Sequence, residues 1–238
     1  MIGIDVSKWQ RKIDWERVSK DIDFAFVRCG YINTDGTVTE DDFFRVNMEQ
    51  AAAAGVPVGV YVYSYVNKAN AKKAAERVLE MVKPYRLEMP LVFDFEDEKY
   101  KNNSKAHNAE IVWDVLEVWE AAGYYAMWYT YKYFANTYVN ADALKRFDFW
   151  LAHYTNETDY RRAFGVWQYS SKGRLEGIAG DVDMNIGYKN YPALIKGAGL
   201  NRLNCVDIVF DDLTAAAAEE VRTFADAAGI PYTVRNGG

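Results

Sequence analysis

The sequence predicts an α/β fold in which a mainly parallel sheet closes into a barrel, followed by a small C-terminal β-α-β segment. Three observations support this prediction: eight short strand-like runs, helix-like segments in the first five gaps between them, and no room for such segments in the last two gaps. Strands that alternate with helices favour a parallel sheet, and eight such strands favour a barrel. Residues 1–197 are therefore predicted to form a TIM-like but irregular (β/α)5(β)3 barrel.

The predicted strands are apolar runs bounded by turn residues; they cover residues 2–6, 24–30, 58–66, 89–96, 124–130, 148–154, 164–169 and 181–186. The predicted helices are bounded by capping or helix-stopping residues; they comprise a short helix opened by Asp14, residues 42–54, residues 70–82, residues 104–123 and part of 131–146. The gaps at 155–163 and 170–180 are short and rich in Gly, Ser and Asn. Neither can hold a full crossover helix, so the last three strands follow one another directly.

Residues 198–238 fall outside the barrel. They are predicted to form a strand at 205–210, a helix at 214–228 and a second strand at 231–235. A unit of about 40 residues rarely buries enough surface to fold alone. We therefore expect it to dock on the barrel or on another copy of itself, with wall binding or self-association as its role.

Composition excludes several classes of protein. The chain has 238 residues, of which 50% are hydrophobic, so it can bury a large core. A net charge of −6 with no basic stripe argues against a nucleic-acid partner. No apolar run approaches the roughly 20 residues of a membrane span, so no membrane insertion is expected. The two cysteines, Cys29 and Cys205, are expected to be free thiols rather than a disulfide or a metal framework.

Asp94 and Glu96 are the strongest candidates for catalytic residues. They are separated by one apolar residue at the end of an apolar strand, so both side chains point to the same face of the sheet. Two buried carboxylates are costly to ionise together, which favours one of them acting as an acid. Paired carboxyl groups of this kind perform glycoside cleavage.

Asp5 and Asp183 lie in the first and eighth predicted strands, each on the face opposite the apolar residues of its strand. In barrels of this class the site forms at the C-terminal ends of the strands, so these two acids are expected to join Asp94 and Glu96. A single strand-end aspartate is more often a turn or cap residue, but four acids on one rim favour a site. Tyr61, Tyr63 and Tyr65 alternate with valines and are expected either to face the acids or to fill the core.

No metal or cofactor is expected. The chain lacks the Cys and His spacing of a zinc site, and carboxylates alone would suit calcium or magnesium at best.

The chain resembles the family 25 glycoside hydrolases, which are lysozyme-type N-acetylmuramidases found among phage endolysins and bacterial autolysins. The resemblance spans about residues 1–190 and rests on the segments GIDVSKWQ (3–10), IDW (13–15), FVR (26–28), AGVPVGVY (54–61), FDFE (93–96), WLA (150–152), VWQYS (166–170) and GDVDMN (180–185). It implies a barrel of eight strands and five helices.

The resemblance also implies cleavage of the β-1,4 bond between N-acetylmuramic acid and N-acetylglucosamine in peptidoglycan. Glu96 would be the general acid, with Asp94, Asp5 and Asp183 as supporting acids. Groove aromatic residues are carried over at Tyr61, Tyr63, Tyr129 and Trp167. The protein would act on the bacterial cell wall. Because Met1 runs directly into the first strand, no signal peptide is expected, and release would follow a holin-like or lytic route.

Strand spacing leaves the mechanism open. Residues two apart on a strand have Cα atoms roughly 6.7 Å apart, between the spacings of retaining and inverting carboxylate pairs. By analogy with family 18 chitinases, which share the Asp-x-Glu arrangement, the favoured route uses the acetamido group of the substrate, oriented by Asp94. The main alternative to an enzyme is a non-catalytic barrel that binds cell-wall sugars; a metal-dependent deacetylase or amidase is a second alternative.

Overall fold

The computed structural model describes residues 1–203 and 214–227. The chain divides into two compact units, Met1–Asn204 and Cys205–Gly238. The first unit contains every strand described here. In the second, the described part is one helix, α7 (Ala215–Ala227), which matches the helix predicted there. The predicted strands at 205–210 and 231–235, and Cys205, lie outside the described residues.

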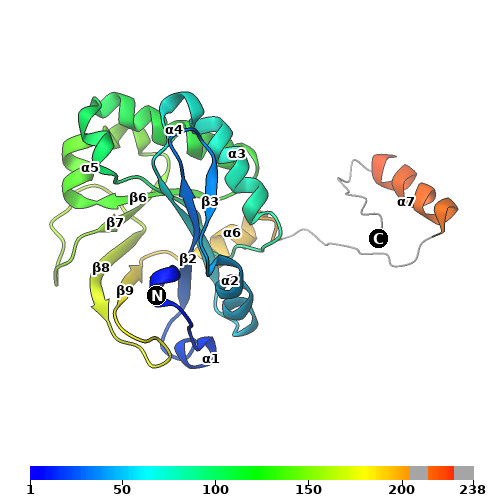
Figure 1. Ribbon diagram of the computed structural model, residues 1–238, viewed down its shortest axis with the longest axis horizontal. Helices are drawn as coiled ribbons and strands as arrows, with labels where there is room; N and C mark the ends of the chain where they lie inside the picture. The colour runs from blue at the N-terminus through cyan, green and yellow to red at the C-terminus, as the bar shows by residue number, and fades with distance from the viewer. Residues whose placement is uncertain (204–213, 228–238) are drawn as a thin grey trace. The chain divides into compact units, whose positions relative to one another are not determined.

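The first unit is a closed eight-stranded barrel with one additional short strand (Figure 1). The strands of the described residues are β1 (Ile2–Val6), β2 (Phe24–Ile32), β3 (Val38–Glu40), β4 (Val58–Ser64), β5 (Leu91–Asp94), β6 (Ala126–Tyr131), β7 (Asp148–Ala152), β8 (Val166–Gly173) and β9 (Val182–Gly187). Their order is β1-β9-β8-β7-β6-β5-β4-β2-β3, and β1 also pairs with β2, which closes the barrel. Neighbours from β1 through β2 and β4 to β8 are parallel, whereas β9 is antiparallel to both β8 and β1. The predicted irregular barrel is confirmed.

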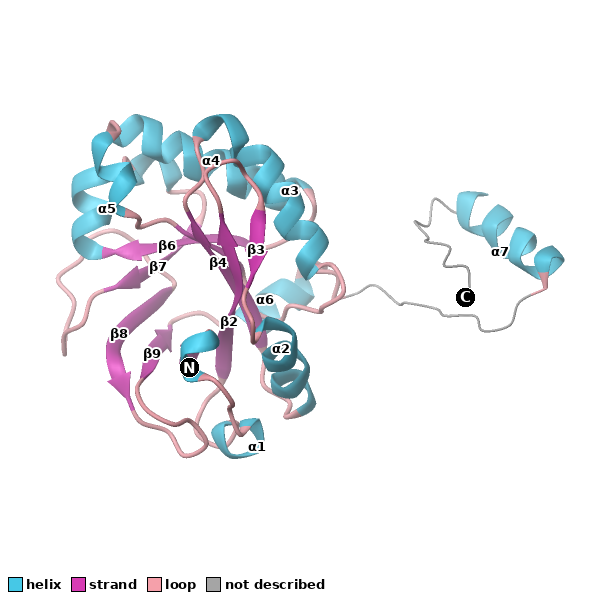
Figure 2. Cartoon of the chain, viewed as in Figure 1, coloured by secondary structure: helices cyan, strands magenta, loops and turns pink. Residues whose placement is uncertain are grey.

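Helices cover the barrel unevenly, as Figure 2 shows, with the longer ones along the parallel strands. The first unit contains α1 (Trp15–Val18), α2 (Phe44–Ala53), α3 (Ala71–Val82), α4 (Lys105–Ala121), α5 (Lys132–Tyr138) and α6 (Tyr191–Gly197). Short 3-10 helices lie at Lys8–Gln10, Lys68–Asn70, Glu98–Asn102 and Ala141–Leu144. Asp14 and Ser104 cap α1 and α4 as predicted, because each side chain accepts a hydrogen bond from a backbone N–H of the first turn.

Besides the 3-10 helices, one strand and one α-helix of the described residues were not predicted. Strand β3 is too short to show a period, and it forms by pairing with the end of β2. Helix α6 follows the last strand, where Pro192 stands in its first turn and Asn190 caps it. Asn70, the first residue of the helix predicted at 70–82, makes no such capping bond; its side-chain amide instead donates to the carbonyl of Thr34.

Apolar side chains form two layers on either side of the sheet. The larger layer packs the outer faces of the strands, such as Val60 and Phe93, against the helices. The smaller layer fills the barrel interior with Phe26, Met127, Trp150 and neighbouring side chains, and Tyr191 and Ile195 of α6 belong to it. The Tyr191 hydroxyl donates to Asp148, the first residue of β7, so α6 closes the N-terminal end of the barrel. The opposite end remains for a site.

A β-bulge shifts the register of β2 against β4. Arg28 pairs with Tyr61, but Gly30 pairs with Val62, so Cys29 is the extra residue. Gly30 has φ +153°, and a Cβ there would lie 2.0 Å from the carbonyl oxygen of Thr39. Glycine is therefore required at this position. Cys29 is fully buried as a free thiol, as expected.

None of the described helices is long and apolar enough to cross a membrane.

Candidate active site

A cavity of about 260 Å³ opens where the parallel strands end. Its walls combine four carboxylates with aromatic rings and two other polar side chains: Asp5, Arg28, Tyr61, Tyr63, Asp94, Glu96, Tyr129, Trp150, Tyr154, Gln168 and Asp183. All four acids predicted from the sequence are therefore brought together. They come from β1, the end of β5 and β9, which are far apart in the sequence.

Strand register explains this convergence. Asp5 on β1 lies directly opposite Asp183 on β9, and Asp94 on β5 pairs with Tyr63 on β4 and with Tyr129 on β6. Directly paired residues point to the same face of a sheet. Because β9 runs antiparallel, Asp183 near its beginning reaches the same rim as residues at the ends of the parallel strands.

Asp5 is held by amide side chains. Its Oδ2 accepts hydrogen bonds from Gln168 Nε2 and Asn185 Nδ2, each at 2.8 Å. Gln168 Oε1 in turn accepts from the hydroxyls of Tyr129 and Tyr154, at 2.9 and 3.0 Å. Burial, followed by the charge of Asp183, raises the pKa of Asp5 well above its ordinary value, while the two amides oppose this rise.

Asp94 is as buried as Asp5 and has a carboxylate oxygen that no described protein group satisfies. The residue is 4% exposed, and within the described chain its Oδ1 has no hydrogen-bond partner. Such an atom is costly to bury unless a ligand or water completes it. Burial first, then the charge of Glu96, raises the pKa of Asp94, and the guanidinium of Arg28 lowers it. Arg28 is fixed by Asp41, whose Oδ2 accepts from its Nε and Nη2 at 2.8 and 2.6 Å.

Glu96 holds a proton near neutral pH. Burial, and then the charges of Asp183 and Asp97, raise its pKa from an ordinary value near 4.5 to about 7. Burial also raises the pKa of Asp183 to about 6. A carboxylic acid that is still half protonated at pH 7 has the property a general acid needs.

A second cavity, of about 550 Å³, adjoins the first. It shares Glu96, Tyr129 and Tyr154 with the acidic cavity, and its other lining residues are Tyr131, Lys132, Tyr133, Asn136, Ala152 and His153. Glu96 therefore stands at the border between an acidic cavity and an aromatic one. This arrangement can hold two joined groups, one on each side of the carboxyl.

The predicted aromatic residues divide into two sets. Tyr61, Tyr63 and Tyr129 line the acidic cavity. Tyr65 follows the end of β4, is 36% exposed and lines neither cavity.

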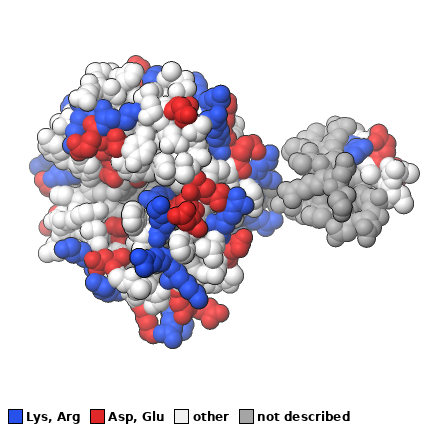
Figure 3. Space-filling model, in the orientation of Figure 1, with Lys and Arg blue, Asp and Glu red and all other residues white. Residues whose placement is uncertain are grey.

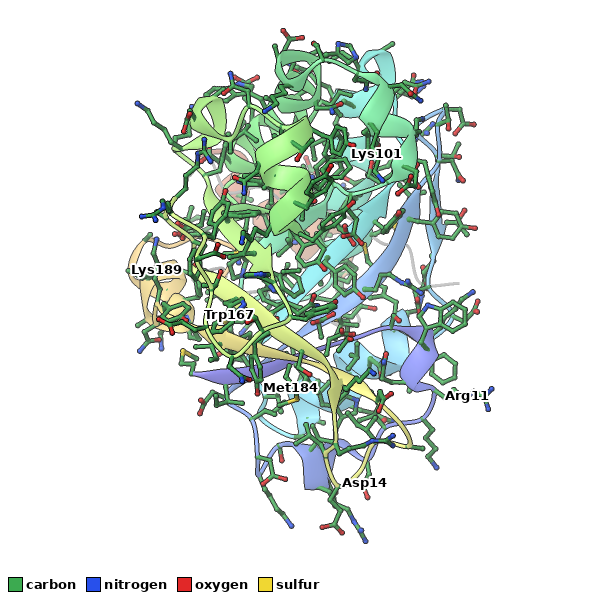
Figure 4. All side chains as sticks on the ribbon, turned by 90° about the vertical axis from the view of Figure 1, so that its left-hand side faces the viewer. Arg11, Asp14, Lys101, Trp167, Met184 and Lys189 are labelled. Atoms are coloured by element: carbon green, nitrogen blue, oxygen red, sulfur yellow. The ribbon has the colours of Figure 1, made fainter. Side chains whose placement is uncertain are left out.

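Trp167 is not in the site, contrary to the expectation from the sequence. Gln168 points into the barrel, so its neighbour Trp167 points outward into the larger apolar layer, where its Nε1 donates to the carbonyl of His153 at 2.9 Å. Figure 4 labels Trp167 on β8 and Met184 on the neighbouring strand β9; both pack in this outer layer. The physical reason is the alternation of side chains along a strand.

Sequence reasoning missed Arg28, Trp150, Tyr154 and Gln168 as lining residues. Gln168 and Trp150 lie in segments that carried the family resemblance, but their inward direction depends on the phase of β7 and β8. The alternation of side chains along β7 and β8 would have identified both residues had the inward face of these strands been known.

In the described ranges, 1–203 and 214–227, no group of three His, Cys, Asp or Glu side chains is arranged to hold a metal ion. On the face drawn in Figure 3, lysines and arginines are interspersed with acids rather than gathered into one basic patch.

Comparison with known proteins identifies the same region of the chain. Residues 4–178 match the model of the family described as "Glycosyl hydrolases family 25". An uncharacterised protein of Escherichia coli K12, YegX, is 30% identical over 197 residues, covering 77% of this chain and 68% of its own length. Lysozyme M1 of Streptomyces globisporus is 29% identical over 204 residues, covering 77% and 66%.

Among solved structures, the modular autolysin LytC of Streptococcus pneumoniae superposes with a TM-score of 0.69 at 28% identity. The match covers 79% of this chain and 46% of LytC, so this chain corresponds to a little under half of that protein. A second structure of LytC contains a synthetic peptidoglycan ligand.

Proposed function

This chain belongs to glycosyl hydrolases family 25, and from that premise we propose that it hydrolyses peptidoglycan at the β-1,4 bond between N-acetylmuramic acid and N-acetylglucosamine. The observation that carries the proposal is the cavity ringed by Asp5, Asp94, Glu96 and Asp183, with Glu96 at its border with an aromatic cavity. A glycan laid across this border has its bridging oxygen beside Glu96.

Glu96 is the general acid in this proposal. With a pKa of about 7 it is about half protonated at neutral pH, and the protonated form donates its proton to the bridging oxygen as the bond to C1 breaks. The muramyl ring occupies the acidic cavity, and the leaving glucosaminyl ring occupies the aromatic one. Tyr129 and Tyr154 line both cavities and would contact the sugars on either side of the bond.

Asp94 orients the acetamido group of the muramyl ring. Its buried Oδ1 lacks a partner within the described chain, and an acetamido N–H is a donor that would complete it. So held, the acetamido oxygen attacks C1 as the glycosidic oxygen leaves. A cyclic oxazolinium intermediate results, and Asp94 stabilises its positive charge. Water then attacks C1 while Glu96 takes a proton from it, which restores the acetamido group.

Asp5 and Asp183 support the developing charge. Four acids with raised pKa values carry fewer than four negative charges before the reaction begins, and positive charge that develops on the sugar favours their ionisation. Gln168 and Asn185 keep Asp5 in place for this role.

The relatives are consistent with this substrate. Lysozyme M1 is 29% identical, and LytC, at 28% identity, has been solved with a synthetic peptidoglycan ligand. The site of action in this proposal is the bacterial cell wall.

The test is digestion of purified peptidoglycan followed by mass spectrometry of the fragments. We expect fragments that end in reducing N-acetylmuramic acid, and none from the Glu96→Gln protein. Fragments ending in reducing N-acetylglucosamine would refute the bond assignment. Binding of peptidoglycan without release of any reducing ends would instead establish a non-catalytic sugar-binding barrel.

A further inference from the structure

Three tyrosines form a continuous aromatic strip that begins in the acidic cavity and leads out over β4 and β2. Tyr63 lines the cavity, its ring centroid lies 5.0 Å from that of Tyr65, and Tyr65 lies 6.0 Å from Tyr31. Tyr31 and Tyr65 are each 36% exposed. The strip of Tyr31, Tyr63 and Tyr65 thus offers solvent-accessible ring surface that is continuous with the site.

The bulge in β2 builds this strip. Because Cys29 is the extra residue, Tyr31 pairs with Tyr63 and shares its face of the sheet. Without the bulge, the alternation beyond Arg28 would turn Tyr31 to the opposite face. Position 30 in the bulge accepts only glycine, so this glycine is required for the direction in which Tyr31 points.

Polar contacts hold the Tyr63 hydroxyl and the backbone of Tyr65. Lys99 Nζ donates to the carbonyl oxygen of Tyr65 at 2.6 Å and to Asn67 Oδ1 at 2.9 Å. The Tyr63 hydroxyl donates to Asp97 Oδ2 at 3.2 Å. Among the described residues, the three rings belong to neither apolar layer. Exposed tyrosine rings offer large contact area to a ligand at low entropic cost, because a tyrosine side chain has only two rotatable bonds to order.

The position of the strip relative to the two cavities indicates which ligand it contacts. Along the barrel rim the order is β2, β4, β5, β6, β7. The strip lies on the β2 and β4 side of Asp94 and Glu96, and the aromatic cavity lies on the β6 and β7 side. A glycan that occupies the acidic cavity and extends away from the aromatic cavity toward β4 and β2 passes over the strip.

We propose that the strip of Tyr31, Tyr63 and Tyr65 binds further sugar rings of the same glycan, on the side opposite the leaving group. This inference rests on the proposed function. It makes the enzyme select long glycan strands and cut within them. Sugar rings present apolar C–H faces that pack on tyrosine rings, while their hydroxyl groups stay in water.

The test compares long, peptide-free glycan strands with a tetrasaccharide of two disaccharide repeats. In the double variant Tyr31→Ala/Tyr65→Ala we expect KM for long strands to rise at least about tenfold, because two ring contacts worth roughly 0.7 kcal/mol or more each are lost. We expect kcat to stay within about twofold and the tetrasaccharide to be affected far less. The variant Tyr31→Phe/Tyr65→Phe keeps both rings and should restore the KM.

Tyr188→Ala is the matched control, since Tyr188 is 56% exposed and lines neither cavity. The thermal unfolding temperature of each variant, compared with that of the wild-type protein, shows whether the variant is folded. Equal loss on both substrates, or no loss on long strands, would overturn the proposal.

A binding measurement separates this inference from the proposed function. In the Glu96→Gln background, the alanine pair should weaken binding of long strands at least about tenfold without any turnover being needed. If the wild-type protein released no reducing ends, the proposed function would fail, and this binding result would still decide whether the strip holds glycan. Unchanged binding would refute it.

Discussion

Replacing Glu96 with glutamine should stabilise the protein at alkaline pH while it removes turnover. Glutamine has nearly the same shape as glutamic acid but never carries a charge. In the wild-type protein the pKa of Glu96 is raised from about 4.5 to about 7, first by burial and then by Asp183 and Asp97. The folded state therefore opposes ionisation of this group.

The size of the effect follows from this shift. The pKa of Glu96 is higher in the folded state than in the unfolded state. Its contribution to the free energy of unfolding is therefore fully present below pH 4.5 and is lost as the pH rises through about 7. A rise in the pKa of Glu96 from about 4.5 to about 7 corresponds to about 3 kcal/mol. Relative to wild type, Glu96→Gln should gain about 3 kcal/mol in unfolding free energy between pH 4 and pH 8. Its turnover should fall at least about 100-fold, the usual scale for losing a general acid.

Urea denaturation at pH 4 and pH 8, with reducing-end release measured on the same preparations, tests both effects. Glu98→Gln is the control, because the Glu98 side chain is 81% exposed on the same segment. The control should show neither the pH-dependent gain in stability nor the loss of turnover. If Glu96→Gln and the wild-type protein showed the same difference in unfolding free energy between pH 4 and pH 8, the claim that the folded state opposes ionisation of Glu96 would be refuted. Near-normal turnover would refute its role as the acid.

Three further substitutions test separate parts of the site. Asp94→Asn should lower kcat by about 100-fold or more, the scale for losing one electrostatic contact to the reacting group; initial rates on peptidoglycan measure it, and a change confined to KM would contradict the assignment. Asp183→Asn removes a negative charge that raises the pKa of Glu96, so the alkaline limb of the pH–rate profile should move to lower pH; an unmoved limb would count against this coupling. Trp167→Phe should lower the unfolding free energy by about 1–3 kcal/mol, through lost packing and the lost bond to His153, and should leave KM for glycan within about twofold. A large rise in KM would indicate that Trp167 contacts the glycan and would contradict its placement in the outer apolar layer.

Much of the barrel followed from local patterns. Capping by Asp14 and Ser104, and the apolar runs of the strands, depend on neighbouring residues, and the structure contains them at nearly the predicted bounds. Helix α6 and strand β3 were missed because each is short, and each is stabilised by contacts with parts of the chain distant in sequence or by strand pairing.

The site was predicted in part. Asp94 and Glu96 were predicted to share a face because residues two apart in an extended segment point the same way. In the structure β5 ends at Asp94, and Glu96, two residues later, lines the same cavity. Placing Asp5 opposite Asp183 required strands 178 residues apart to pair, and the direction of Trp167 required the phase of β8 within the closed sheet. The bulge that turns Tyr31 toward Tyr63 also has no local signature beyond a glycine.

By itself the sequence determined how side chains alternate along each strand, where most helices begin and end, and that two carboxyl groups stand two residues apart at the end of one strand. Only the tertiary structure decided which faces turn inward, which acids meet, and which of their oxygens lack partners. The physical reason is that side-chain alternation is a property of a single strand, whereas register, barrel closure and burial arise from pairing between distant segments, and burial sets the pKa of the acids.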